Sequence, residues 1–408
     1  MIEFEVPEKI TGIMNVIETV AVNMMRPVSR YFDENEHEIP WDFINFMQTA
    51  SKGMGGSTSL APSSKKEGPR IGYQRLASIV EGLSWGDSGI YLCLPGGMLG
   101  SAAVMAAGND EQKERFLKRF SGDKPVFDAM CMTEPHAGSD TSAIRASAVL
   151  DKETNEWVLN GEKIFVTSGH KAMLDSEGFI VVWATIDPSA GRAGMRSFVV
   201  ESGTPGAQVT KLEHKLGIRA SDTASIVLQD CRVPYSNILG SPTVEKTTKG
   251  FKGAMATFDA TRPIIAAQAI GLARATLELV IEMLAERGVN IRYGLPRQKM
   301  TAIEKEVIDM EIQLRSAWLL TLKAVWMMDN GKPNSLESSM CKVKAGDAVN
   351  KITQKAVEIM GPIGYSREYL LEKWFRDAKI IDIYEGTGQI NRLVVARKIL
   401  EYRSRDLR

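Results

Sequence analysis

A glutamate near the end of the chain has the neighbours expected of a general base. Glu385 stands between Tyr384 and Gly386, directly after the isoleucine-rich run Ile380–Ile383. Apolar surroundings disfavour a charged carboxylate, so they raise its pKa toward the range in which it accepts protons at neutral pH. A loop glutamate that faces water would explain the same residues. The rest of the chain has to decide between these two interpretations.

A second stretch, residues 130–142, combines small residues with hydroxyl groups. Gly138 lets a flat or phosphorylated ligand approach the backbone, because glycine has no side chain. The hydroxyls of Thr133 and Ser139 offer directed hydrogen bonds. Met130 and Met132 flank the start of this stretch. A turn between a helix and a strand explains the composition equally well.

Two further segments carry groups suited to a planar or charged ligand. After a predicted turn at Asn160-Gly161, Phe165 and Thr167 are expected on one face of a strand, since they are two residues apart. An aromatic ring beside a hydroxyl suits a planar heterocycle, although Phe165 would also fit a core. Near residue 258 a helix is expected to begin with Asp259 as its cap, and Arg262 would pair with an acid or bind a phosphate.

The composition excludes some function classes. The 408 residues are 44% hydrophobic and 25% charged, which is ordinary for a globular protein. Fifty basic residues balance fifty acidic ones, so bulk electrostatic capture of nucleic acid or of an anionic membrane is not expected. The length suggests two or three packing units.

The cysteines and histidines predict neither a disulfide framework nor a metal site. The four cysteines are far apart and form no CxxC pair, which indicates reduced thiols. The four histidines show no metal-ligand spacing. No signal peptide and no apolar run of about 18 residues is recognised, so a cytoplasmic protein without a membrane span is expected.

The apolar pattern changes twice along the chain. Residues 1–125 read as helical, with a helix-spaced stripe between Glu8 and Asn23, a predicted surface loop from Lys52 to Arg70, and a capped helix start at Asn109 or Asp110. Residues 126–242 carry short β-rich runs separated by turn signals. Residues 243–408 are helical again, and between Ile303 and Val325 apolar residues recur at three and four positions. We therefore expect an α+β protein with a helical domain, a small antiparallel barrel or sandwich, and a helical bundle.

Four motifs in the same order resemble the acyl-CoA dehydrogenase family of flavoproteins over essentially the whole chain. A single motif would be weak, but four across about 260 residues are highly specific. The motifs are Met-Thr-Glu-Pro-x-Ala-Gly-Ser-Asp from Met132 to Asp140, Asn-Gly-x-Lys-x-x-x-Thr from Asn160 to Thr167, Phe-x-x-Thr-Arg-Pro from Phe258 to Pro263, and Trp-x-Arg-Asp-Ala followed by Tyr-Glu-Gly-Thr-x-Gln from Trp374 to Gln389.

The resemblance implies a fold, a cofactor and an activity. The fold would be an N-terminal helical domain, a middle β-domain and a C-terminal four-helix bundle. The cofactor would be FAD, Glu385 would remove the α-proton of an acyl-CoA, and the β-hydrogen would leave as hydride to the flavin N5. Electrons would pass to an electron-transfer flavoprotein, and the protein would be a homotetramer or a homodimer.

The resemblance also implies which residues contact each ligand. Residues assigned to FAD are Met130, Met132, Thr133, Gly138, Ser139, Phe165, Thr167, Tyr293, Gly361, Thr387 and Gln389. Residues assigned to the acyl-CoA are Ser139, Tyr91, Asp259, Arg262, Tyr384 and Gly386. Thr387 and Gln389 would bind the ribose and adenine of FAD, and Phe165 stands where the family often has tryptophan.

The chain departs from the family pattern at the expected pyrophosphate contacts. The family has an Arg, a Phe-Gly three residues later and a Gln eleven residues after the Arg, in part across a subunit interface. Aligning Tyr293-Gly294 with Phe-Gly places Asn290 and Thr301 at the Arg and Gln positions. Aligning Arg287 and Gln298 instead leaves Asn290-Ile291 in the Phe-Gly place. Pro362 after Gly361 replaces a second glycine and removes a backbone donor.

Several alternatives stay open. Tyr91 and Pro95 would suit a pocket for a short, branched or cyclic acyl group, but Tyr91 would equally suit the helical core. An acyl-CoA oxidase or related flavin oxidase would use oxygen instead of a protein acceptor. A non-catalytic flavoprotein with a DNA-binding role is disfavoured by the neutral charge and by Glu385.

Overall fold

Short helices form the N-terminal part of the protein. The computed structural model describes residues 8–53, 71–244 and 249–402, so most of the predicted Lys52–Arg70 loop lies outside the described residues. Asn109 caps one helix by accepting from the Gln112 N–H, as predicted. The helices are α1 (Glu8–Val20), α2 (Ser29–Glu34), α3 (Trp41–Gly53), α4 (Gly72–Gly86), α5 (Ser88–Tyr91), α6 (Leu99–Ala107) and α7 (Asp110–Leu117).

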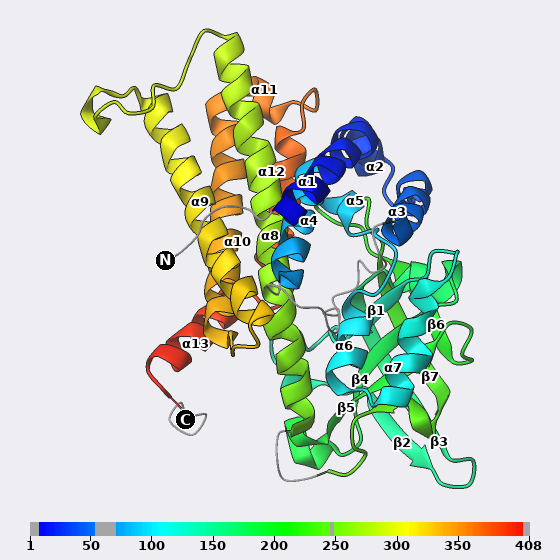
Figure 1. Cartoon of the computed structure of the whole chain (residues 1–408). Coiled ribbons are helices and arrows are strands. Elements are labelled where there is room, and N and C mark those ends of the chain that lie inside the picture. Colours follow the sequence, from blue (N-terminus) through cyan, green and yellow to red (C-terminus); the bar gives the residue numbers. More distant parts are fainter. Residues whose placement is uncertain (1–7, 54–70, 245–248, 403–408) are drawn as a thin grey trace.

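The middle part is one sheet that α6 and α7 cover on one face (Figure 1). Its order is β6-β7-β3-β2-β4-β5-β8, with β1 beside β4. Most neighbours are antiparallel, as expected, but β4 pairs in parallel with β1 and β2. The strands are β1 (Asp128–Cys131), β2 (Ser147–Asp151), β3 (Glu156–Thr167), β4 (Phe179–Thr185), β5 (Met195–Glu201), β6 (Ala207–Leu212), β7 (Thr223–Pro234) and β8 (Ile238–Leu239).

The predicted turn at Asn160-Gly161 is wrong. Both residues lie inside β3, whose pairing with β7 shifts register between Leu159 and Gly161. Gly161 has a φ of 151°, and a Cβ there would lie 2.6 Å from the Ala146 Cβ, so only glycine fits this bulge. The Asn-Gly pair signals an irregularity, and pairing with β7 decides that the strand continues through it.

The C-terminal part is a helical bundle built around α8, which extends from the bundle to the sheet (Figure 1). The apolar repeat between Ile303 and Val325 forms the buried face of α9, as predicted. The helices are α8 (Lys249–Glu286), α9 (Ala302–Asp329), α10 (Ser335–Met360), α11 (Pro362–Tyr365), α12 (Leu371–Ile381) and α13 (Gly388–Ile399).

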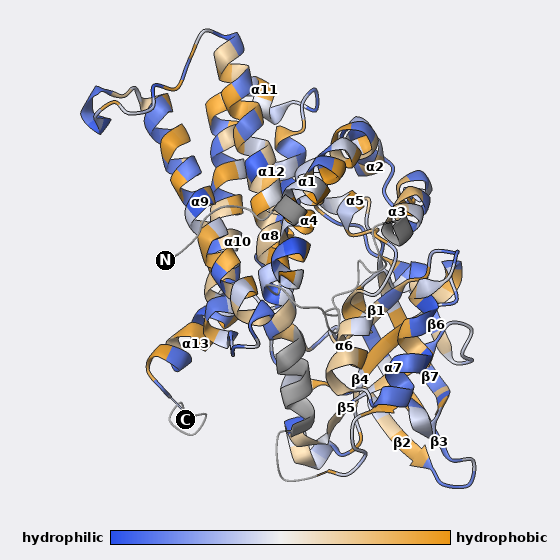
Figure 2. Cartoon of the chain, in the orientation of Figure 1, coloured by the Kyte–Doolittle hydropathy of each residue, from blue (hydrophilic) through white to orange (hydrophobic). Residues whose placement is uncertain are grey.

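The segment Phe258–Glu286 of α8 is long and apolar enough to cross a membrane. It nevertheless packs against α4, α9 and α10, and 72% of its most apolar stretch is buried. Hydrophobic residues recur along the bundle helices and the strands, with hydrophilic residues between them (Figure 2). The apolarity of this segment is therefore that of a core helix.

A buried ion network joins the three parts of the chain. The Lys373 Nζ on α12 lies 2.7 Å from a carboxylate oxygen of Asp87, which caps α5, and 2.7 Å from one of Asp377. Asp377 also accepts from the backbone N–H of Ile218, in the connection between β6 and β7. Burial lowers the pKa of Lys373, but the two carboxylates outweigh burial and the net shift is upward.

Candidate active site

The segment that carries Glu385 is a tight connection between α12 and α13. Glu385 has a φ of 56° and Gly386 a φ of 90°, so two consecutive residues are left-handed. For a residue other than glycine this conformation costs about 1–3 kcal/mol, and it persists where neighbours hold it. Here Asn391 donates to the carbonyl oxygens of Gly386, at 2.7 Å, and Thr387, at 3.2 Å.

The Glu385 carboxylate has polar neighbours on two bundle helices, α8 and α10. Thr261 on α8 donates a hydrogen bond of 2.6 Å to Glu385 Oε2. Burial raises the pKa of Glu385; the Thr261 hydrogen bond and the charges of Arg262 and Lys342 oppose this shift without cancelling it. The expected rise in pKa is thus confirmed, although polar neighbours limit it. Such a carboxylate is suited to take a proton from carbon.

Replacing Thr261 by Val should move the base toward its protonated form. Valine keeps the volume but removes the donor that stabilises the carboxylate, so the pKa of Glu385 should rise further. A general base acts as its carboxylate, so if Glu385 is the base the acid limb of the rate–pH profile should move to higher pH, with roughly a several-fold loss of rate near pH 6. Stopped-flow flavin reduction across pH measures this; an unchanged acid limb contradicts the role of Thr261.

Arg262 is placed behind the Glu385 segment. Only 4% of its surface is exposed, and its Nη1 lies 3.0 Å from Asp259 Oδ1 and 3.3 Å from Ser339 Oγ. Arg262 therefore pairs with an acid, the first of its two predicted alternatives, and phosphate binding stays a prediction. Asp259 lies inside α8, so its prediction as a helix cap is wrong, because the helix begins ten residues earlier at Lys249. Acyl-CoA contacts of both residues stay predictions.

Tyr384, the neighbour of the base, is tied to the N-terminal helices. Its hydroxyl donates to Gln268 Oε1 on α8, and the Gln268 amide donates to Ser88 Oγ on α5 at 2.8 Å. Tyr91 ends the same short helix and is only 3% exposed. This chain of contacts places α5 on the Glu385 side of α8.

The second group of predicted residues gathers where β1 ends and β3 passes. The carbonyl of Thr133 accepts from the Ile164 N–H at 2.9 Å, which brings residue 133 next to the Phe165–Thr167 stretch. Below them, the buried Lys163 Nζ lies 2.7 Å from Glu134 Oε1 and 3.2 Å from the carbonyl of Met132. Glu134 also accepts hydrogen bonds from the backbone N–H groups of Arg145 and Ala146, so both of its carboxylate oxygens have partners.

Phe165 presents its ring to solvent. It has a φ of 57° at a second register shift of β3, and 60% of its surface is exposed. The register shift between Lys163 and Val166 interrupts the simple alternation on which the shared face of Phe165 and Thr167 was predicted, so that shared face stays a prediction. Gly138 and Ser139 are also exposed, and a Cβ added at Gly138 would meet nothing within 4 Å. An exposed ring, hydroxyls and an open glycine fit one side of a planar, phosphorylated cofactor.

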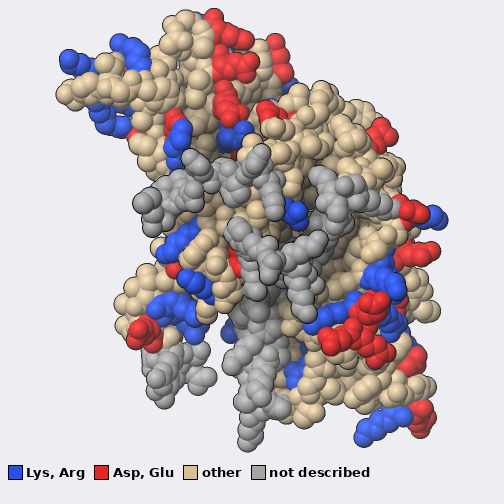
Figure 3. Space-filling model, viewed as in Figure 1, with Lys and Arg blue, Asp and Glu red and all other residues tan. Residues whose placement is uncertain are grey.

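The remaining predicted cofactor residues fall into two places. Thr387 caps α13 by accepting from Ile390, and Gln389 is exposed beside it, so both accompany Glu385. Tyr293 and Gly361 lie at the opposite end of the bundle, where α8 and α10 end (Figure 1). Lys and Arg side chains gather on the segment that protrudes there between α8 and α9 (Figure 3). One chain therefore does not bring Tyr293 and Gly361 to the Glu385 site.

The structure adds residues that sequence reasoning did not assign. Thr261 belongs to a recognised motif, but its hydrogen bond to Glu385 needed the fold. Lys342 on α10 is buried, and its amine has no hydrogen-bond partner in the described part of the chain. Burial lowers the pKa of Lys342 to about 8, against the pull of Asp382 and Glu385. In the sequence, Lys342 is one lysine among many on an amphipathic helix and gives no signal.

Three sequence models of one family match successive parts of the chain. The N-terminal domain of acyl-CoA dehydrogenase matches residues 8–123, the middle domain matches residues 129–231, and the C-terminal domain matches residues 248–400. The predicted boundaries near residues 125 and 242 fall between these matches.

Individual relatives give the same result. Acryloyl-CoA reductase (NADH) of Anaerotignum propionicum is 40% identical over 74% of this chain and 74% of its own length. The mitochondrial short-chain specific acyl-CoA dehydrogenase of Rattus norvegicus is 34% identical over 98% of this chain and 92% of its own. The structure of butyryl-CoA dehydrogenase from Megasphaera elsdenii superposes with a TM-score of 0.83 at 30% identity, covering 98% of this chain and all of that one.

The family matches, the relatives and the division into helices, sheet and bundle agree with the resemblance carried by the four motifs. They also agree with the half-buried Glu385 carboxylate and with the exposed ring of Phe165. The chain belongs to the acyl-CoA dehydrogenase family of FAD-dependent oxidoreductases.

Proposed function

We propose that this protein dehydrogenates a short-chain acyl-CoA between its α and β carbons, with Glu385 as the base. The observation that carries the proposal is the Glu385 carboxylate itself. It is desolvated, has a raised pKa and is oriented by a 2.6 Å hydrogen bond from Thr261. A thioester α-hydrogen is only weakly acidic, so its removal needs a positioned base of this kind.

The residues of the chain would divide the work as follows. FAD, when bound, supplies the acceptor for the β-hydrogen and its electron pair. Thr133, Phe165 and Thr167 would hold the flavin ring, and Thr387 and Gln389 its ribose and adenine. Glu385 would take the α-proton, and a backbone N–H of its own segment would bind the thioester oxygen. Thr261, Arg262 and Asn391 would fix the segment while the proton moves.

The preference for a short acyl group rests on two supports. The relatives are named for acryloyl-CoA, butyryl-CoA and short-chain acyl-CoA. Tyr91 ends α5, which the hydrogen bonds of Ser88 with Gln268 and of Gln268 with Tyr384 connect to the Glu385 segment, and its buried ring adds bulk to that helix. A short group is therefore favoured among the short, branched or cyclic alternatives.

The same site also serves the reverse reaction. The relative named as a reductase is 40% identical to this chain. A Glu385 whose pKa is raised is more readily protonated, and in that form it would return a proton to the α-carbon of an enoyl-CoA. The base and the acid would then be one residue in its two protonation states.

Partners, assembly and location belong to the same proposal. We place electron-transfer flavoprotein as the acceptor, by the family resemblance. Homo-oligomerisation, as a homotetramer, is supported by an exposed apolar stripe on α9 at intervals of seven residues: Ile312, Leu319 and Trp326. The four free, buried cysteines support a reducing compartment such as the cytoplasm.

A spectral titration tests the proposed function. The holoprotein under nitrogen should lose its oxidised flavin absorbance with butyryl-CoA, more slowly with branched and cyclic acyl-CoA esters, and far more slowly with dodecanoyl-CoA. Re-oxidation should require an electron-transfer flavoprotein. Fastest reduction by dodecanoyl-CoA would overturn the short-chain preference, and rapid peroxide release in air would favour an oxidase.

A further inference from the structure

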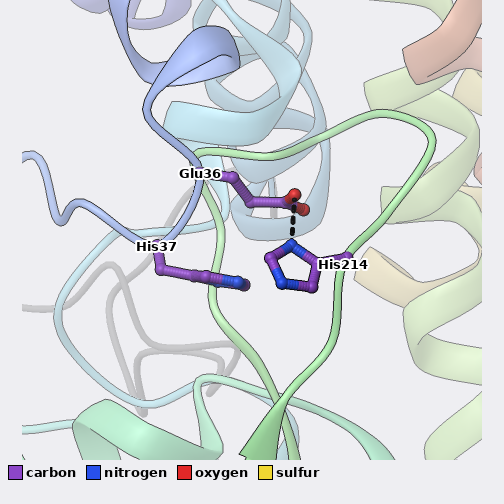
Figure 4. Close-up of side chains that lie close together, drawn as sticks. All are labelled: Glu36, His37 and His214. Atoms are coloured by element: carbon purple, nitrogen blue, oxygen red, sulfur yellow. Dashed lines mark hydrogen bonds and ion pairs between the residues drawn. The ribbon is translucent and has the colours of Figure 1, made fainter.

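Three metal-ligating side chains meet at the junction between the N-terminal helices and the sheet. Glu36 and His37 lie between α2 and α3, and His214 lies between β6 and β7. Figure 4 shows the His37 ring directed toward His214, with Glu36 across from it. Glu36 Oε2 is 3.0 Å from His214 Nδ1, and the two imidazole rings are 4.7 Å apart between centroids. One ligand atom from each residue lies within 4.8 Å of the other two.

The backbone and burial of His37 prepare it for a ligand. His37 has a φ of 80°, a left-handed conformation that turns its ring inward. Its Nδ1 is buried and has no hydrogen-bond partner within the described ranges. A buried ring nitrogen without a partner is costly, and a metal ion would satisfy it.

Glu36 is oriented by one oxygen and offers the other. Its Oε1 accepts from the Lys215 N–H at 2.7 Å and lies 3.7 Å from the Lys215 Nζ. Lys215 is itself held by the carbonyl of Ser221 at 2.8 Å. The other oxygen, Oε2, faces His214. A bound metal ion would replace the contact between Oε2 and His214, while Oε1 would keep the Lys215 N–H as the outer hydrogen-bond partner that is typical of a metal-binding carboxylate.

We propose that Glu36, His37 and His214 form a binding site for a divalent transition-metal ion, for which Zn²⁺ is the probe. Two imidazoles and one carboxylate are ligands that zinc accepts, and a water molecule would complete the tetrahedron. Tetrahedral zinc ligands lie about 3.3 Å apart, from its Zn–N bond length. The cluster therefore has to tighten, and the His214 side chain, 79% exposed, is free to do so. The bound ion would join the N-terminal helices to the sheet.

No local pattern indicates this site, since His37 and His214 stand 177 positions apart. The simpler explanation is a Glu36–His214 ion pair alone, with Lys215 opposing any cation. That explanation leaves the buried His37 nitrogen without a role. The two explanations differ in one measurable property, which is stoichiometric zinc binding that needs His37.

Isothermal titration of the untagged, chelator-treated holoprotein with zinc decides between them. Wild type should bind one zinc ion per chain. His214→Ala and His37→Asn should each weaken binding at least tenfold; asparagine is chosen because it tolerates a left-handed backbone. His136→Ala removes an exposed histidine elsewhere and should bind as wild type does. Retained flavin absorbance in each variant shows that it folds.

Zinc should also raise the unfolding temperature of wild type and His136→Ala, but not of His214→Ala, because a ligand of the native state stabilises it. Absence of stoichiometric binding to wild type would overturn the site. Equal binding by wild type, His214→Ala and His37→Asn would overturn it as well. Neither result bears on the Glu385 reaction, so the site and the proposed function stand or fall separately.

Discussion

Replacing Glu385 by Gln should leave FAD bound and slow flavin reduction by butyryl-CoA about 10²- to 10⁴-fold. Glutamine keeps the size of the side chain and still accepts the Thr261 hydrogen bond, but it cannot take the α-proton. The loss corresponds to about 3–5 kcal/mol of transition-state stabilisation. Anaerobic stopped-flow spectroscopy of the flavin absorbance measures it directly.

The matched control for this variant is Glu368→Gln, an exposed carboxylate in the segment between α11 and α12. It should reduce its flavin at the wild-type rate. If Glu385→Gln also reduced its flavin at that rate, another group would be the base. Unchanged FAD content in both variants shows that the chemical step, and not cofactor binding, has been altered.

Replacing Lys373 by Met should destabilise the protein by about 3–5 kcal/mol, because it leaves buried carboxylates without their cation. Asp87 and Asp377 each lie 2.7 Å from the lysine nitrogen, and they belong to different parts of the chain. The N-terminal helices should therefore separate from the bundle more easily. The first unfolding transition should occur at a lower urea concentration than in wild type. Circular dichroism across a urea gradient follows this transition.

Lys118→Met is the comparison for Lys373→Met. Lys118 pairs with Glu114 at 3.2 Å, but the two side chains are 76% and 73% exposed. An exposed pair of this kind contributes about 0–1 kcal/mol. Equal urea midpoints for the two variants would show that the buried network contributes no more to stability than a surface pair does.

The sequence predicts those features that depend on local pattern. The α9 repeat and the Asn109 cap follow from periodicity and turn chemistry, and both are observed. Glu385 is predicted as a site residue in the same way, because its motif is a short continuous stretch. Burial raises its pKa, but the neighbours that the structure shows are Thr261, Arg262 and Lys342 and not an apolar surrounding.

Features that depend on contacts between distant segments were predicted wrongly or were not predicted. Asn160-Gly161 is not a turn, because β7 pairs along both sides of it. Asp259 is not a cap, because α8 continues through it. The contacts of Thr261 with Glu385 and of Lys373 with Asp87 join residues 124 and 286 positions apart. No local signal encodes which of many similar side chains will meet across such separations.

The placement of Thr261 and Gln268 on one helix limits which insertions and deletions α8 can accept. They are seven residues apart, about two helical turns, so they lie on the same face of α8. Thr261 hydrogen-bonds to Glu385, and Gln268 hydrogen-bonds to the adjacent Tyr384. Adding or deleting one residue between Thr261 and Gln268 would rotate one of these side chains about the helix axis by about 100° relative to the other. Insertions and deletions between Thr261 and Gln268 are therefore excluded. The end of α8 near Glu286 does not have this constraint. The spacing of Thr261 and Gln268 on α8 therefore fixes the position of Glu385 relative to the bundle.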